Sequence, residues 1–188
     1  YKDGEKMMFA WAGQGEFEYP TNKNMWAHCF TFPRRLNVID GVLVQNPSKS
    51  FELLKENTVG DKGTFNGAKM IENRNNTYHL KVAFDVESSD KFGINLISCD
   101  DERLILEFDK KNQKVKLDRS QLKHKFVEEY GMIRRSKCSI KDKLNVEILV
   151  DNSIAEIFIN DGEVAMTTRI FPSPKAKNIE FFSNARIE

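Results

Sequence analysis

The feature that most constrains this chain is the alternation of apolar and polar residues near its C-terminal end. Positions 144, 146, 148 and 150 are apolar, and the polar residues Asn145 and Glu147 stand between the first three of them. A period of two is the side-chain period of a β-strand with one buried face. An apolar run at residues 154–159 follows, then Asn160-Asp161-Gly162, then a returning run at residues 163–170. Asp-Gly between apolar runs is a strong hairpin signal, so this stretch predicts consecutive antiparallel strands.

Further short strands are predicted upstream and downstream of this stretch, at residues 78–86, 92–98, 102–108, 114–118 and 179–187. Turn residues separate them, and long helical periodicity is nearly absent. Many short strands with frequent turns are typical of an antiparallel β-sandwich. Residues 120–130 stay open between a short helix and a loop, because apolar residues recur there at every fourth position. We therefore predict an all-β protein with its sandwich at residues 60–188.

The first 45 residues have a different pattern. Strands are predicted at residues 6–11, 26–32, 35–39 and 42–45, with a loop rich in Gly and Pro among them. A unit of so few strands has only marginal stability by itself. We therefore expect residues 1–45 to belong to a larger domain. Residues 46–59 are predicted to be a linker with one short helix, at about residues 48–56, that begins at a serine cap.

Composition excludes several classes of partner and site. The 29 basic and 28 acidic residues nearly cancel, which disfavours nucleic-acid and anionic-membrane binding. No apolar run reaches the length of about 18 residues that a membrane helix needs. The three cysteines are odd in number, are widely spaced and form no Cys-x-x-Cys pair. This pattern disfavours a disulfide framework or a zinc site and favours a reducing, cytoplasmic location.

Several ordered motifs resemble those of one enzyme family. They are Ala-Trp-Ala-Gly (residues 10–13), Tyr-Pro-Thr (19–21), Trp-Ala-His-Cys-Phe-Thr-Phe-Pro-Arg-Arg-Leu (26–36), Leu-Asp-Arg-Ser (117–120), Glu-Ile-Phe-Ile-Asn-Asp-Gly-Glu (156–163) and Thr-Arg-Ile-Phe-Pro (168–172). In this order they are similar to the sucrose and sucrose-6-phosphate hydrolases of glycoside hydrolase family 32. Departures are Ala10 for a glycine, Ala12 for a methionine, Arg35 for a glutamate, and Phe30 and Phe32 for leucines.

The resemblance implies a five-bladed β-propeller followed by a β-sandwich. Residues 1–45 would then be the remnant of the last propeller blade, residues 46–59 the linker, and residues 60–188 the C-terminal sandwich. It also implies that residues 120–130 form a loop.

The resemblance further implies that catalytic carboxylates lie in Asn-Asp-Pro, Arg-Asp-Pro and Glu-Cys motifs. Retaining glycosidases need two carboxyl groups roughly 5 Å apart. Here the residues before the five prolines are Tyr19, Phe32, Asn46, Phe171 and Ser173, and those before the three cysteines are His28, Ser98 and Lys137. None of the three motifs is present, so we expect the catalytic set upstream of Tyr1, no catalytic residue in this chain, and no activity from the chain alone.

Trp11 is the one candidate substrate-binding residue. The resemblance implies that its ring lies near the central pocket of the propeller, against a fructosyl unit, and aromatic faces suit sugars. The alternative is that Trp11 fills the blade core. His28 and Cys29 are strand neighbours that point to opposite faces, so they do not suggest a nucleophile and its base. His79 and His124 lack ligand spacing, and Asp100-Asp101-Glu102 is expected to be a solvated turn, so no metal and no cofactor are predicted.

The resemblance thus implies a non-catalytic C-terminal part of a hydrolase that cleaves sucrose or sucrose 6-phosphate and releases fructose. Its partners would be its own N-terminal propeller, a fructoside substrate in the complete enzyme, and a second copy in a homodimer. The alternative function is a lectin-like carbohydrate-binding sandwich, which requires exposed aromatic residues on one sheet face. The sequence does not discriminate among sucrose, its 6-phosphate and a fructan.

Overall fold

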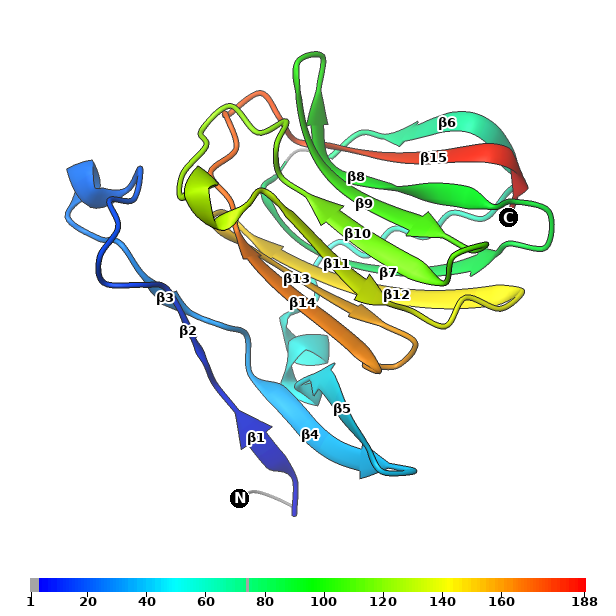
Figure 1. Ribbon diagram of the computed structural model, residues 1–188, viewed down its shortest axis with the longest axis horizontal. Helices are drawn as coiled ribbons and strands as arrows, with labels where there is room; N and C mark the ends of the chain where they lie inside the picture. The colour runs from blue at the N-terminus through cyan, green and yellow to red at the C-terminus, as the bar shows by residue number, and fades with distance from the viewer. Residues whose placement is uncertain (1–3, 74) are drawn as a thin grey trace.

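A computed structural model describes residues 4–73 and 75–188 of the chain. Its regular secondary structure is almost entirely antiparallel β-strand, as the alternation predicts (Figure 1). The first three residues of the predicted blade remnant lie outside the described part. No helix among the described residues has the length and apolar character needed to cross a membrane.

The body of the molecule is a sandwich of two antiparallel sheets. The larger sheet has six strands in the order β11-β10-β9-β8-β15-β6. Their bounds are β6 (Phe65–Ile71), β8 (Lys91–Cys99), β9 (Glu102–Asp109), β10 (Lys114–Asp118), β11 (Ile133–Lys137) and β15 (Asn178–Ile187). The smaller sheet has the order β14-β13-β12-β7, with β7 (Thr77–Asp85), β12 (Lys143–Asp151), β13 (Ile154–Ile159) and β14 (Val164–Arg169). The predicted sandwich is therefore present.

The sandwich core forms where the apolar faces of the two sheets meet. Phe84 of β7 packs against Phe92 of β8, with ring centroids 5.2 Å apart, and Phe92 stacks on Phe108 of β9 at the same separation. Phe92, Phe108, Leu144 and Ile148 are fully buried. This is the apolar alternation of the sequence expressed as packing, because each strand presents every second side chain to the opposite sheet.

The Asn160-Asp161-Gly162 turn connects β13 to β14 as predicted. All three residues have positive φ, and Gly162 reaches +92°. A Cβ at Gly162 would lie 2.1 Å from the carbonyl oxygen of Gln45, so this position is glycine for two reasons, conformation and close approach.

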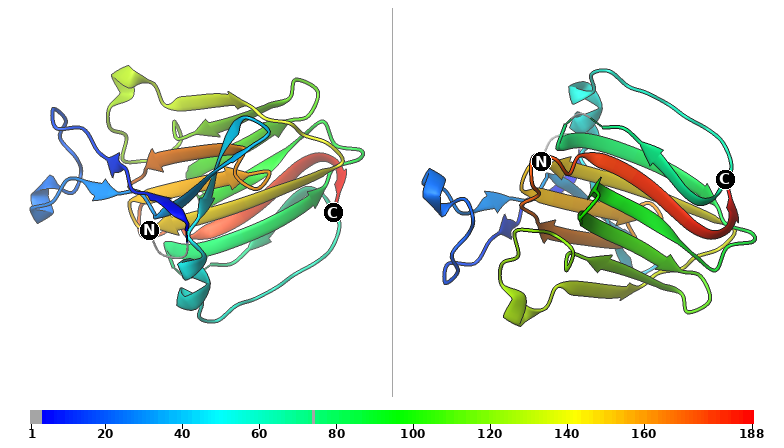
Figure 2. Two further views of the ribbon diagram at one scale, coloured as in Figure 1. Left: turned by 90° about the horizontal axis from the view of Figure 1, so that it is seen from below. Right: turned by 90° about the horizontal axis from the view of Figure 1, so that it is seen from above.

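The N-terminal segment, residues 4–47, lies outside the sandwich core. It contains a three-stranded sheet in the order β1-β4-β5, built from β1 (Lys6–Met8), β4 (Arg34–Ile39) and β5 (Val42–Pro47). A two-residue pair, β2 (Trp11–Ala12) with β3 (Cys29–Phe30), extends from it, and a short 3₁₀ turn η1 (Asn22–Asn24) lies between them. The segment lies along one side of the sandwich and projects beyond it (Figures 1 and 2).

Several predicted elements differ from the observed ones. Of the predicted strand at residues 26–32, only the two residues of β3 are a strand in the structure. Strands β6 and β11 were not predicted. The predicted linker helix is the 3₁₀ helix η2 (Lys49–Leu54), where the side chain of Ser48 caps the amide of Ser50. Residues 120–130 are mostly loop, with one 3₁₀ turn η3 (Glu128–Tyr130), so the loop alternative is confirmed.

Candidate functional site

Trp11, the predicted substrate-binding residue, lies on β2 with 56% of its surface exposed. Its ring packs edge-on against the imidazole of His28, with centroids 5.0 Å apart. A Cβ on Gly13 would lie 2.7 Å from both the Trp11 indole nitrogen and the His28 ring. The glycine of the Ala-Trp-Ala-Gly motif thus leaves room for this ring pair. Within this chain the Trp11 ring makes a T-shaped contact with His28, and more than half of its surface remains exposed.

Tyr19 and Gln14 make further contacts that hold the His28 ring of this pair. The hydroxyl of buried Tyr19 accepts a hydrogen bond from the amide of Gln14 (2.9 Å), and the Gln14 carbonyl lies 3.2 Å from His28 Nε2. The Tyr19 ring meets the His28 ring edge-on at 5.1 Å. The loop between β2 and β3 is thereby tied to one buried aromatic residue.

Arg169, the last residue of β14, joins this loop to the sandwich. Its Nη1 donates to the carbonyls of Ala12 (2.9 Å) and Ala27 (3.1 Å), and its Nε donates to the carbonyl of Ser153 (2.9 Å). Its guanidinium also lies 5.2 Å from the ring centroid of Tyr19. A buried guanidinium is costly unless its donors are satisfied, and these carbonyls satisfy them.

A buried ion pair makes a second connection, between β4 and β13. Nη2 of Arg34 lies 2.9 Å from Oε2 of Glu156, and Nε donates to the same oxygen at 3.0 Å. The amide of Phe32 donates to the other carboxylate oxygen at 3.0 Å. Arg34 also donates to the side chains of Gln45 (2.9 Å) and Thr167. Burial raises the pKa of Glu156, and the charge of Arg34 and the Phe32 amide counter part of that rise.

We call these two connections the arginine clamps: Arg169 with its carbonyl acceptors, and Arg34 with Glu156. Arg34, Glu156 and Arg169 lie in the motifs given above, but no role was predicted for them from the sequence. The available signal was a charged residue inside an apolar strand run, such as Glu156 between Ala155 and Ile157. Charged side chains are rarely fully buried unless they are paired, so such a position predicts a partner.

The structure gives no support to cysteine chemistry. Burial raises the pKa of Cys29, and the His28 ring next to it in sequence is engaged by Gln14 and the aromatic residues. Burial likewise raises the pKa of Cys138 to about 11. A thiol with a raised pKa is a poor nucleophile.

One group among the described residues, Glu52, His79 and Glu147, is close enough to hold a metal ion, with ligand atoms within 4.8 Å of one another. Its geometry fits an ion-pair network better. The Lys81 ammonium donates to Glu52 (2.9 Å) and lies 3.4 Å from Glu147, so a cation already lies between the carboxylates. A metal on His79 Nε2 would also require a proton on Nδ1, which is buried without a partner.

The same pair of carboxylates, Glu52 and Glu147, approaches the spacing of a retaining glycosidase. Such an enzyme needs one of the two in its protonated form. Hydrogen bonds from Lys55 and Lys81 lower the pKa of exposed Glu52 to about 2. Burial opposes ionisation of Glu147, but the hydrogen bond with His79 and the charge of Lys81 outweigh burial and lower its pKa. Neither group is suited to be the acid.

The predicted solvated turn at 100–102 is partly wrong. Asp101 is exposed and pairs with Lys123 at 2.8 Å. Glu102 is fully buried and accepts the amides of Lys123 (3.2 Å) and Ser173 (3.1 Å), so it fastens two loops to the sheet.

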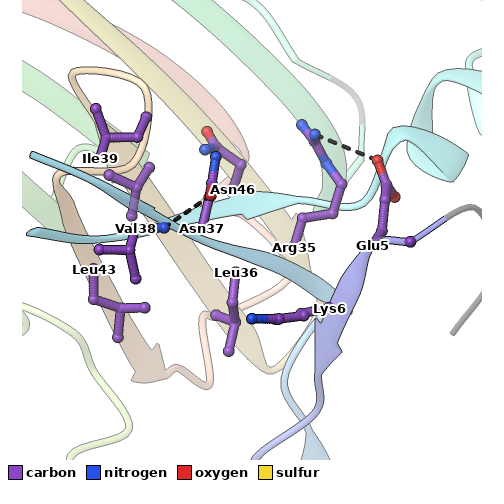
Figure 3. A pocket seen from close by; sticks show the side chains of 11 residues that line it. Glu5, Lys6, Arg35, Leu36, Asn37, Val38, Ile39, Leu43 and Asn46 are labelled. Atoms are coloured by element: carbon purple, nitrogen blue, oxygen red, sulfur yellow. Dashed lines mark hydrogen bonds and ion pairs between the residues drawn. The ribbon is translucent and has the colours of Figure 1, made fainter. Parts of the chain in front are cut away.

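A groove of 530 Å³ lies on the three-stranded sheet of the N-terminal segment, away from Trp11 (Figure 3). One end carries charged groups, where Arg35 lies 3.6 Å from Glu5. The other end is apolar and is lined by Leu36, Val38, Ile39 and Leu43. A groove of exposed apolar side chains suits a protein surface better than a sugar.

An array of exposed aromatic residues, which the lectin-like alternative requires, is missing from the described part of the sandwich. Tyr130 is its exposed large aromatic residue, and that ring packs edge-on against Phe17 at 5.0 Å. Phe84, Phe108 and Phe158 are buried.

Comparison with known proteins shows which proteins this chain is similar to. Residues 43–188 match the family described as "Glycosyl hydrolases family 32 C terminal". The sucrose-6-phosphate hydrolase of Vibrio alginolyticus is 30% identical over 173 residues, which are 90% of this chain and 33% of that protein. The solved sucrose-6-phosphate hydrolase of Lactobacillus gasseri superposes with a TM-score of 0.82 at 28% identity, over 99% of this chain and 38% of that one. The solved exo-inulinase of Aspergillus awamori has the same fold, with a TM-score of 0.80 at 22% identity. That superposition covers 98% of this chain and 40% of the inulinase chain. This chain thus spans about a third of the length of the curated relatives it matches.

Proposed function

Because this chain belongs to glycoside hydrolase family 32, we propose that it acts as the C-terminal part of a longer hydrolase that releases fructose from sucrose or sucrose 6-phosphate. The observation that carries the proposal is the family match over residues 43–188 in a chain that spans only a third of its curated relatives. The catalytic carboxylates would lie in the remaining two thirds. The missing Asp-Pro and Glu-Cys motifs agree with that placement.

We assign residues 1–45 to the end of the upstream propeller, residues 46–59 to the linker and residues 60–188 to the C-terminal sandwich. Exposure supports the first assignment. Ten of the fifteen exposed large apolar side chains in the described residues belong to the N-terminal segment: Met7, Phe9, Trp11, Met25, Trp26, Phe30, Val38, Ile39, Val42 and Leu43. An excess of exposed large apolar side chains in one segment is typical of an interface with another part of a protein.

Trp11 is assigned to the fructosyl pocket of the complete enzyme. Its indole is in T-shaped contact with His28 and is 56% exposed, so much of the ring is available to a sugar. An aromatic face buries the C–H surface of a sugar while the hydroxyl groups find polar partners around it.

The sandwich supports the propeller by means of the arginine clamps, which fasten the N-terminal segment to the smaller sheet. A homodimer and a cytoplasmic location remain predictions from the sequence.

The test is an activity assay on the complete enzyme, in which this chain follows its upstream region. Fructose release is measured from sucrose, sucrose 6-phosphate and inulin. We expect turnover of a sucrose-type substrate, and loss of that turnover when the acid/base or nucleophile carboxylate of the upstream region is replaced by its amide. An upstream region without the three carboxylate motifs, or a complete protein inactive on all three sugars, would refute the proposal.

A further inference from the structure

We propose that Arg169 is a positioning residue for Trp11, so that the sandwich sets the geometry of the sugar-binding tryptophan. This inference rests on the proposed function, in which Trp11 contacts the fructosyl unit. It assigns the sandwich a direct effect on substrate binding in addition to mechanical support.

The first argument is that few other hydrogen bonds fix the backbone around Trp11. On its N-terminal side, the Ala10 carbonyl accepts the Thr31 amide at 2.8 Å, and the Ala10 amide donates to the Thr31 hydroxyl at 2.9 Å. The β2–β3 ladder is only two residues long on each strand, pairing Trp11 with Phe30 and Ala12 with Cys29. Ladders of this length are marginal on their own. Nη1 of Arg169 donates to the carbonyls of Ala12 and Ala27, which directly adjoin Trp11 and His28 in the chain. One guanidinium nitrogen thus joins the two backbones that carry the Trp11–His28 ring pair.

The second argument is a relay of rings from the same guanidinium. Arg169 stacks on Tyr19, Tyr19 meets His28 edge-on, and His28 meets Trp11 edge-on, with centroids 5.1 and 5.0 Å apart in the two ring pairs. Edge-to-face pairs prefer a defined orientation, so a displaced Tyr19 would tilt both rings beyond it.

The third argument is that Arg169 itself is rigid. It is 7% exposed, and its Nε and Nη2 are held by the carbonyl and hydroxyl of Ser153. The Phe171 ring lies 5.2 Å from the guanidinium carbon. A planar fork with five donors can serve Ser153, Ala12 and Ala27 at once, which a lysine ammonium on a flexible stem cannot do with the same geometry.

The experiment measures kcat and KM of the complete enzyme on sucrose for Arg169→Lys, Trp11→Ala and the double variant, with Arg135→Lys, an exposed arginine of β11, as the matched control. Trp11→Ala is expected to lower kcat/KM by about 10- to 200-fold. Arg169→Lys is expected to cause a smaller loss, mainly as a higher KM, because the ring contacts the sugar in both the ground and transition states. Arg135→Lys should change neither constant.

Coupling between the two sites decides the issue. If Arg169 acts through Trp11, Arg169→Lys changes kcat/KM by less than about twofold once Trp11 is already alanine. A lower denaturation midpoint with unchanged KM, or an equal loss in both backgrounds, would overturn the positioning role. If Trp11→Ala leaves kcat/KM unchanged, the assignment of Trp11 to the substrate is wrong, and the positioning role is overturned with it.

Tyr19→Leu provides a second route if Arg169→Lys does not fold. It removes the ring that lies between the Arg169 guanidinium and the His28 ring. We expect a rise in KM of about two- to fivefold that disappears in the Trp11→Ala background, and an unchanged KM in the folded variant would overturn the relay.

Discussion

The sandwich and the N-terminal segment of this chain place their large apolar side chains in opposite ways. The two sheets enclose fully buried residues such as Phe92, Phe108 and Ile148, whereas the N-terminal segment exposes Phe9, Phe30 and Met25. The sandwich is therefore held together by apolar burial. The N-terminal segment is held to it mostly by hydrogen bonds, an ion pair and ring contacts.

The difference shows how the N-terminal segment can be fixed to the sandwich while its own apolar side chains stay exposed. The arginine clamps are directional, so they fix where the N-terminal segment lies with few contacts. The apolar side chains of that segment are then free to pack on something else. A segment anchored by its own apolar face would have none left for a partner.

The largest expected effect is all-or-none. It concerns the proposal that the N-terminal segment belongs to an upstream domain that carries the catalytic residues. The 188-residue chain should release no fructose from sucrose or sucrose 6-phosphate, because it contains none of the three motifs in which we expect the carboxylate pair of a retaining glycosidase. Released fructose is measured against a buffer blank and against the complete enzyme. Turnover that persists at constant specific activity through repeated purification would contradict the prediction.

A matched pair of phenylalanines tests the contrast in burial directly. Phe108→Ala in the sandwich should lower the free energy of unfolding by about 3–5 kcal/mol, because it leaves a cavity in a closed core. Phe30→Ala, at a side chain that is 71% exposed, should change it by no more than about 0.5 kcal/mol. Urea denaturation of the chain measures both. Equal losses would show that the N-terminal segment has an apolar core of its own.

A matched pair of glycines tests where the two regions touch. Gly162→Ala should cost about 1–3 kcal/mol from its positive φ alone, and crowding against the Gln45 carbonyl adds to this. Gly41→Ala has similar strain but open space around the new methyl group, so it should cost less.

Hydrogen exchange locates the effect. The amide of Gln45 donates to the Gly162 carbonyl at 3.0 Å, so its exchange should accelerate in Gly162→Ala and not in Gly41→Ala. Unchanged exchange at Gln45 in Gly162→Ala would mean that the turn does not hold the segment.

The smallest effect concerns Glu147 on the outer face of the smaller sheet, near the linker. Its pKa is lowered below the ordinary 4.5. The stability it contributes is therefore present above that value and is lost as the pH falls through its folded pKa. Glu147→Gln should cost about 0.5–1 kcal/mol at neutral pH and should reduce the loss of stability below pH 4.5. Parallel pH profiles for the two proteins would disprove the assignment.

Local pattern predicted the sandwich well, because most of its strands are buried on one face and alternate accordingly. The two missed strands, β6 and β11, are the edges of the larger sheet. Gly67 and Ala68 weaken the alternation in β6, and Arg134 and Arg135 do so in β11. Edge strands bury fewer apolar side chains, so the apolar alternation in their sequences is weaker.

The contacts around the candidate site could not be predicted in this way. Arg34 and Glu156 are 122 positions apart, and no local period relates them. The four-residue spacing of Leu122 and Phe126 suggested a helix, but the two side chains pack in different places. Leu122 enters the sandwich core, whereas Phe126 packs against Tyr19 and Phe171. Two unrelated tertiary contacts therefore produced a spacing that resembles one face of a helix.

The position of β15 has a consequence for how the protein is made. This strand, formed by residues 178–187, lies inside the larger sheet between β8 and β6. A ribosome extends the chain at about 5–20 residues per second, so β6 waits several seconds for the strand that joins it to the sheet. Until then β6 and β8 present unpaired edges, and the larger sheet exists only as β8 to β11. Chaperones that cover strand edges would therefore matter most during synthesis, and a stop codon just before β15 would leave both edges open permanently.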